Sequence, residues 1–169
     1  RGVGHIADLV ALARPTVGVV TRVAAVHTEL FGGLDAVEAA KGELVESLPA
    51  SGTAVLNAAD PRVAAMAART PARVVTFGSG GEVRAEAVTI DDQLRARFRL
   101  ASPWGGAEVA LAVRGAHMVD NALAAAAAAL VCDVPLAAVA AALGAASVSR
   151  WRMDLRTLPS GARLLNDAY

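Results

Sequence analysis

The sequence has few cysteine and aromatic residues, and both shortages limit how the protein can be built. Cys132 is the only cysteine among 169 residues, so no disulfide can form within the chain. This fits a reducing compartment, and we expect a cytoplasmic protein. Cys132 follows an alanine-rich apolar run, so we expect a buried thiol. Aromatic residues make up only 4%, so the core has to be built from Ala, Val and Leu.

Net charge and long apolar runs are also absent. The 16 basic residues balance 16 acidic ones, which leaves no basic field to hold a nucleic acid or an anionic membrane surface. The longest apolar run, Ala122 to Val131, is far shorter than the roughly 20 residues that a bilayer requires. We therefore expect neither a nucleic-acid partner nor membrane insertion.

The first half of the chain alternates between strand patterns and helix patterns. Apolar residues at helical spacing predict helices, and short runs rich in Val predict buried strands. Asp60-Pro61 is typical of a helix start, with an N-cap followed by Pro at the first helical position. Such alternation implies a parallel sheet covered by helices on both faces. The predicted helices are 4–13, 34–48 and 60–68, and the strands are 17–20, 53–56 and 73–77.

The second half begins with three segments of alternating polarity separated by turn residues, which predict antiparallel strands at a sheet edge. Two alanine-rich helices and two short final strands follow. We therefore predict an α/β fold with a mainly parallel sheet, flanking helices and an antiparallel edge. The predicted strands are 82–90, 93–100, 107–113, 152–157 and 162–166, and the helices are 117–131 and 136–143.

Lys41 stands out in the predicted helix 34–48. It lies on the apolar stripe of that helix, between Val37 and Leu44. A buried ammonium is costly unless it is paired or neutralised. Two interpretations follow: Lys41 extends past its neighbours to water, or it has a chemical role.

Two histidines and an asparagine are further candidates. His27 follows the strand 17–20, where open parallel sheets bind ligands, and imidazole is a common metal ligand; the alternative is an ordinary surface residue. His117 and Asn121 share one face at the start of a helix. An amide there can both donate to and accept from a purine edge, and the alternative is helix capping by His117 or Asp120.

Arg152 and Asp167 lie on the two final strands. Arg commonly clamps phosphates, and Asp can hold a ribose hydroxyl or a cation, although both residue types are also ordinary surface charges. The chain contains no G-x-x-x-x-G-K-[ST] motif. Its glycine-rich segment 78–81 lacks the lysine and the following helix, so it is predicted to be a turn between strands.

These signals occur in an order that resembles the central domain of the Mur ligases, and most closely the UDP-N-acetylmuramoyl-tripeptide–D-alanyl-D-alanine ligase family. The resemblance covers essentially the whole chain, and several motifs in register carry it. They are ARPTVGVVT at 13–21, HTELFG at 27–32, AKGEL at 40–44, LNAADPRV at 56–63, HMVDNALAA at 117–125, RWRM at 150–153 and NDAY at 166–169.

The resemblance implies an ATP-dependent amide ligase of peptidoglycan precursor synthesis. In such enzymes ATP phosphorylates the terminal carboxylate of UDP-N-acetylmuramoyl-tripeptide, and the amine of D-Ala-D-Ala attacks the acyl phosphate. Residues 1–169 would be the central ATP-binding domain. The family's phosphate loop would lie upstream of Arg1 and its final domain beyond Tyr169, so the chain alone is expected to be inactive.

The resemblance also implies roles for the candidate residues, with ATP and Mg²⁺ as cofactors. Lys41 would be carbamylated by carbon dioxide and become an anionic oxygen ligand for Mg²⁺. His27 would lie near the second Mg²⁺, and His117 with Asn121 near the adenine. The phosphate and ribose end of ATP would be faced by Arg152 and Asp167.

The chain departs from the family pattern at three places. Arg22-Val23-Ala24 stands where the family tends to have Asn-Val-Gly, Ala59 replaces an acid, and Met118 stands where many relatives have Asn. Arg22 adds positive charge close to the expected cations. Two alternatives stay open: another Mur or folylpolyglutamate-type ligase, or a non-catalytic nucleotide-binding or scaffold relative.

Overall fold

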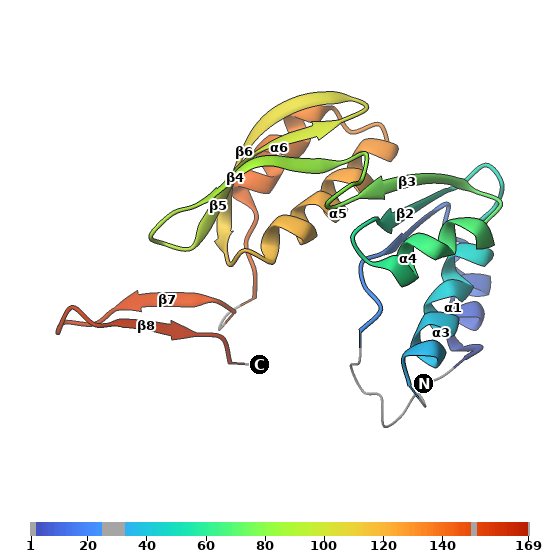
Figure 1. Ribbon diagram of the computed structural model, residues 1–169, viewed down its shortest axis with the longest axis horizontal. Coiled ribbons are helices and arrows are strands. Elements are labelled where there is room, and N and C mark those ends of the chain that lie inside the picture. Colours follow the sequence, from blue (N-terminus) through green and yellow to red (C-terminus); the bar gives the residue numbers. More distant parts are fainter. Residues whose placement is uncertain (1–2, 25–32, 150–151, 169) are drawn as a thin grey trace.

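The computed structural model describes residues 3–24, 33–149 and 152–168 (Figure 1). A three-stranded parallel sheet in the order β1-β2-β3 forms its first part. The strands are β1 (Val17–Val20), β2 (Thr53–Asn57) and β3 (Arg73–Phe77). The helices are α1 (His5–Ala13), α3 (Leu34–Glu46) and α4 (Pro61–Ala65), which continues as the 3-10 helix η1 (Met66–Arg69).

A three-stranded antiparallel sheet follows, in the order β4 (Arg84–Ile90), β5 (Arg95–Ser102) and β6 (Gly105–Arg114). Helices α5 (Met118–Val131) and α6 (Leu136–Ala145) come next. The antiparallel strands, expected at the edge of the parallel sheet, form a sheet of their own. One parallel bridge between Phe77 and Val83 joins them to β3, before the chain turns into β4. The α/β fold predicted from the sequence is confirmed, including the turn at 78–81.

The parallel sheet has a hydrophobic core on each face, because successive side chains of a strand point to opposite faces. Val55 of β2 belongs to the core that contains α5, together with Phe77 of β3. Its neighbours Ala54 and Leu56 pack on the other face against residues of α3, α4 and η1. Helices therefore cover both faces, as expected, and β2 is the central, fully covered strand.

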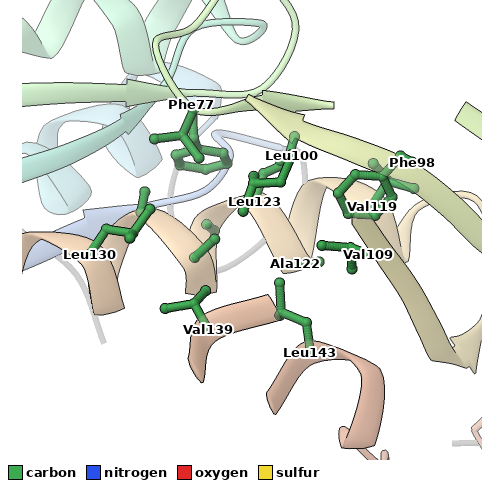
Figure 2. Packing of buried hydrophobic residues seen from close by; sticks show 14 of the residues in the cluster. Phe77, Phe98, Leu100, Val109, Val119, Ala122, Leu123, Leu130, Val139 and Leu143 are labelled. Carbon is green, nitrogen blue, oxygen red and sulfur yellow. The ribbon is translucent and has the colours of Figure 1, made fainter. Parts of the chain in front are cut away.

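The antiparallel sheet packs one face on α5 and α6. Alternate residues of β5 and β6 are buried. Figure 2 shows Leu100 next to Leu123 of α5, and Phe98 and Val109 next to Val119 of the same helix. Val139 of α6 belongs to the same cluster. Phe77 from the parallel sheet joins the same cluster. One continuous core therefore fixes α5 between the two sheets, which positions the N-terminus of that helix.

Alanine lets α5 pack closely at buried positions such as Ala126 and Ala127, and alanine is also the best helix former. The prediction that Cys132 is buried was wrong: the cysteine is exposed. It follows the last residue of α5 as the C-cap, where the chain leaves the packed layer. None of the helices in the described part of the chain combines the length and apolar character needed to cross a bilayer.

The hairpin of β7 (Asp154–Thr157) and β8 (Arg163–Asn166) ends the described chain and extends away from the rest of the molecule (Figure 1). Its open end is closed by Asp167, whose Oδ1 accepts the backbone N–H of Met153 at 3.1 Å. The guanidinium of Arg163 donates to the backbone carbonyl of Asp92, in the turn between β4 and β5.

The carboxylate of Glu43 links α3 to the start of α1. Its oxygens accept the backbone N–H groups of Gly4 and Ala7, the latter at 3.0 Å. These N–H groups have no partner within their own helix, and Gly4 provides no side-chain cap. The hydrogen bonds from Gly4 and Ala7 hold the pKa of Glu43 below its ordinary value. The ionised carboxylate therefore stabilises the packing of α1 on α3.

Replacing Glu43 with Gln should lower the midpoint of thermal unfolding at neutral pH, and the deficit should vanish in acid. Because the folded-state pKa lies below the ordinary value of 4.5, the stabilisation is present above that value and is lost as the pH falls through the folded-state pKa. Thermal unfolding followed between about pH 7 and pH 3 measures this. Glu108→Gln, an exposed position in β6, is the control, and an equal deficit at both ends of the range would contradict the prediction.

Candidate functional site

The carboxyl ends of the three parallel strands meet the N-terminus of α5 around a cavity of about 260 Å³. Thr21 follows β1, whereas Asn57 and Phe77 are the last residues of β2 and β3. Ligands of open parallel sheets bind at this edge. The cavity is lined by Thr21, Arg22, Asn57, Phe77, His117, Asp120 and Asn121.

Asn57 organises this edge of the sheet. In the described part of the chain it is the one buried polar side chain, with 5% exposed. Its Nδ2 donates to the carbonyl of Thr21 at 2.9 Å, and its Oδ1 accepts the N–H of Ala59 at 2.9 Å. A Cβ atom on Gly78, whose φ is +91°, would lie 2.7 Å from that Oδ1. The ends of all three parallel strands therefore meet at this amide: Thr21 follows β1, Asn57 ends β2, and Gly78 follows β3.

Asp60 fixes the segment that follows β1. Its Oδ1 accepts the N–H groups of Arg62 and Val63 at 3.0 and 3.2 Å, which caps α4 as the sequence predicts. Its Oδ2 accepts the N–H of Val23 at 2.8 Å. Because three backbone N–H groups donate to this carboxylate, the role of Asp60 is to hold the backbone beside the site in place.

A second cavity of about 460 Å³ lies beside the first and is lined by Asn57, Asp60, Arg62 and their neighbours. Arg22 and Asp120 line both cavities. Asp120 lies in the first turn of α5, where a carboxylate interacts favourably with the helix dipole. A cation and an anion therefore border the space beyond the strand ends.

A third cavity, of about 440 Å³, brings together four of the predicted site residues: His117, Asn121, Arg152 and Asp167. His117 and Asn121 come from the start of α5, whereas Arg152 precedes β7 and Asp167 follows β8. His117 and Asn121 also line the cavity at the strand ends. The capping alternative for His117 finds no support, because it occupies the N-cap position without a side-chain capping hydrogen bond.

Lys41 is half-buried on α3, and its ammonium donates to the backbone carbonyl of Arg22 just beyond β1. It does not line any of the three cavities. His27, the other predicted metal ligand, lies outside the described residues.

The described residues do not form a complete metal site. Within residues 3–24, 33–149 and 152–168, no group of three or more His, Cys, Asp or Glu side chains could hold a metal ion. Asp60 is engaged by backbone donors, and unmodified Lys41 is itself a donor.

Sequence reasoning missed Asn57 as the organiser of the site, and it treated Asp120 only as a possible helix cap. Asn57 carried one usable signal: it is a polar residue at the carboxyl end of the apolar run Ala54 to Leu56. In a strand covered on both faces, such a side chain has to be hydrogen-bonded.

The fold and the cavities define an α/β domain with a ligand-binding edge at the ends of its parallel strands. Residues 1–129 match the Mur ligase middle domain. The chain is 46% identical over 169 residues to UDP-N-acetylmuramoyl-tripeptide–D-alanyl-D-alanine ligase from Mycobacterium bovis; the match covers 98% of this chain and 33% of that protein. It is 44% identical over 157 residues to UDP-N-acetylmuramate–L-alanine ligase from Stenotrophomonas maltophilia, with 89% and 33% covered.

The structure of MurF from Acinetobacter baumannii has the same fold, with a TM-score of 0.91 and 28% sequence identity over 99% of this chain and 37% of that chain. The chain belongs to the Mur ligase family, in which it matches the middle domain. It spans about a third of the length of the curated relatives named here.

Replacing Asn57 with Ala should lower the free energy of unfolding by about 1–3 kcal/mol, because the carbonyl of Thr21 and the N–H of Ala59 lose their buried partner. Urea unfolding followed by circular dichroism measures the loss. Asn121→Ala removes an exposed amide and should leave stability unchanged. Equal stability of the Asn57 variant and the wild type would show that the strand ends do not depend on this amide.

Proposed function

We propose that the chain is the nucleotide-binding middle domain of an ATP-dependent amide ligase that joins D-Ala-D-Ala to UDP-N-acetylmuramoyl-tripeptide. One observation carries the proposal: residues from two distant segments converge on one cavity, with His117 and Asn121 on one side and Arg152 and Asp167 on the other. The relative from Mycobacterium bovis, named for this reaction, supports the choice of substrates. Both substrates and ATP would be met in the cytoplasm.

The chemistry of this cavity suits a nucleotide. Its volume of about 440 Å³ lies within the range of small-molecule sites, about 300–1,000 Å³. The amide of Asn121 can donate to and accept from the edge of adenine. Asp167 can accept a ribose hydroxyl, and the Arg152 guanidinium can neutralise phosphate oxygens.

The proposed reaction has two steps. A carboxylate oxygen of the tripeptide attacks the γ-phosphorus of ATP, and ADP leaves. The amine of D-Ala-D-Ala then attacks the acyl carbon, the C–O bond to phosphate breaks, and the amine loses a proton. Arg152 would hold phosphate oxygens in place, and other segments of the same protein would complete the site. Mg²⁺ is expected with ATP, but the described residues do not form a complete site for it.

Lys41 is proposed to act as a carbamate. Its ammonium reaches the carboxyl end of β1, where it donates to the carbonyl of Arg22. The carbamate nitrogen would keep one N–H that can still donate to that carbonyl, while the new carboxylate oxygens replace a cation with an anion. The proposed change therefore reverses the charge at the end of β1.

A second candidate is ligation of L-alanine to UDP-N-acetylmuramate, because a relative 44% identical to this chain is named for that reaction. Phosphate release by the full-length protein, with each acceptor paired with its own amine, separates the two. The favoured proposal requires turnover with the tripeptide and D-Ala-D-Ala, and turnover only with the other pair would overturn it.

In the same assay, replacing Asn121 with Ala should raise the KM for ATP about 5- to 150-fold, because one or two hydrogen bonds to adenine are lost. The KM values for the acceptor and the amine should change little, because Asn121 is proposed to contact only the nucleotide. Initial rates against ATP measure the effect. Asn166→Ala, in β8, is the control, and an unchanged KM would make Asn121 an ordinary surface residue.

Replacing Lys41 with Ala in the full-length protein should abolish ligation, and short carboxylic acids at high concentration should partly restore it by supplying the missing anion. Lys41→Arg should not be rescued, because the guanidinium fills the site and keeps its positive charge. Phosphate release with and without added acetate measures both variants. Near-normal ligation by the Ala variant without added acid would rule out the carbamate.

A further inference from the structure

Arg114 carries a buried polar atom that the proposed roles leave without a function. It is the last residue of β6, immediately before the turn into α5. Its Nε is the one buried side-chain nitrogen or oxygen without a hydrogen-bond partner in the part of the chain that the structure describes. A buried donor of a charged group costs free energy when it is unpaired, so such an atom calls for a partner.

The position of Arg114 indicates where that partner binds. Arg114 lines the cavity that also contains His117, Asn121, Arg152 and Asp167. It also lines an adjoining cavity of about 430 Å³ beside the end of α6. The two cavities share Val148, Ser149, Arg152 and Met153 as further lining residues. Arg114 therefore stands in the wall between them.

The acidic residues beside these cavities are already engaged. Asp154 pairs with Arg156 at 2.7 Å, and Asp167 accepts the backbone N–H of Met153. No ion pair within the described ranges includes Arg114. The Nε–H of Arg114 therefore has no partner among the described protein groups, although the residue lines the cavity.

We propose that Arg114 is a nucleotide-binding residue whose Nε–H donates to a ring nitrogen of adenine; this rests on the proposed function. Arg114 lines the same cavity as His117 and Asn121. The His117 ring folds back over the intervening glycine, with its Cε1 2.6 Å from where a Cβ on Gly115 would be. A side chain at Gly115 would thus displace the His117 ring.

A contact of Arg114 with the adenine base is favoured over a contact with the phosphates, because of where the strand ends lie. His117 and Asn121 border both the strand-end cavity and the cavity of Arg114. Of these two cavities, Arg114 lines only the latter, whereas Thr21 and Asn57 line only the former. Phosphates bound to open parallel sheets lie beyond the strand ends, so the base would point toward Arg114, and Arg152, which also lines the cavity of Arg114, would reach the phosphates from that side.

The test compares Arg114→Met and Arg114→Lys in the full-length protein. Displacement of a fluorescent ATP analogue by ATP, ADP and adenosine gives the three dissociation constants. Both variants should weaken all three by the same factor, about tenfold or more for one hydrogen bond from a charged donor. Lysine should fail like methionine because it has no Nε–H at that position. The unfolding midpoint without nucleotide should not fall, because the removed donor has no partner there.

Arg156→Met is the matched control: Arg156 lines the adjoining cavity but not that of His117, so nucleotide affinity should stay unchanged. Weaker binding of ATP and ADP with unchanged binding of adenosine would overturn the base contact in favour of a phosphate contact. If the Arg114 variants keep the wild-type dissociation constants while Asn121→Ala weakens binding, the role of Arg114 alone is overturned. A lower unfolding midpoint of the Arg114 variants without nucleotide would show that Arg114 has a structural role instead. A wild type that binds none of the three would overturn the proposed function itself.

Discussion

The amide of Asn57 is the interaction on which the site depends. Its buried side chain satisfies the carbonyl of Thr21 and the N–H of Ala59, just beyond the ends of β1 and β2. The bond to Thr21 fixes the chain as it leaves β1, and Asp60 fixes it again at Val23. These two side chains therefore hold the backbone between β1 and Val23 in place, and Thr21 and Arg22 of this segment line the strand-end cavity.

A close approach between α3 and β1 places Lys41. A Cβ on Gly18 would lie 3.1 Å from Cγ of Leu44, so the helix sits on the strand at the one residue without a side chain. This brings the ammonium of Lys41 within hydrogen-bonding reach of the Arg22 carbonyl. The glycine in β1 and the lysine in α3 therefore belong to one arrangement, although 23 positions separate them in the sequence.

The order and type of the elements were predictable because each segment is locally consistent. Valine-rich runs became buried strands, and the pair Asp60-Pro61 opened α4 as its chemistry requires. The sequence could not show that the antiparallel strands form their own sheet, because alternation reveals which face of a strand is buried but not which strand pairs with it. The exposed Cys132 was missed because helix ends shift by a residue or two, and one residue decides exposure there.

The sequence by itself determined the alternation of helices and strands, the family resemblance and the identity of the polar residues available for chemistry. Only the tertiary structure decided which of these residues meet. His117 and Arg152 are 35 positions apart, and the chain between them has to fold as α5 and α6 before both can line one cavity. The unpaired Nε of Arg114 was likewise decided by the tertiary structure. An arginine at the end of a strand is ordinary in sequence, and burial without a partner exists only once the core has closed around it.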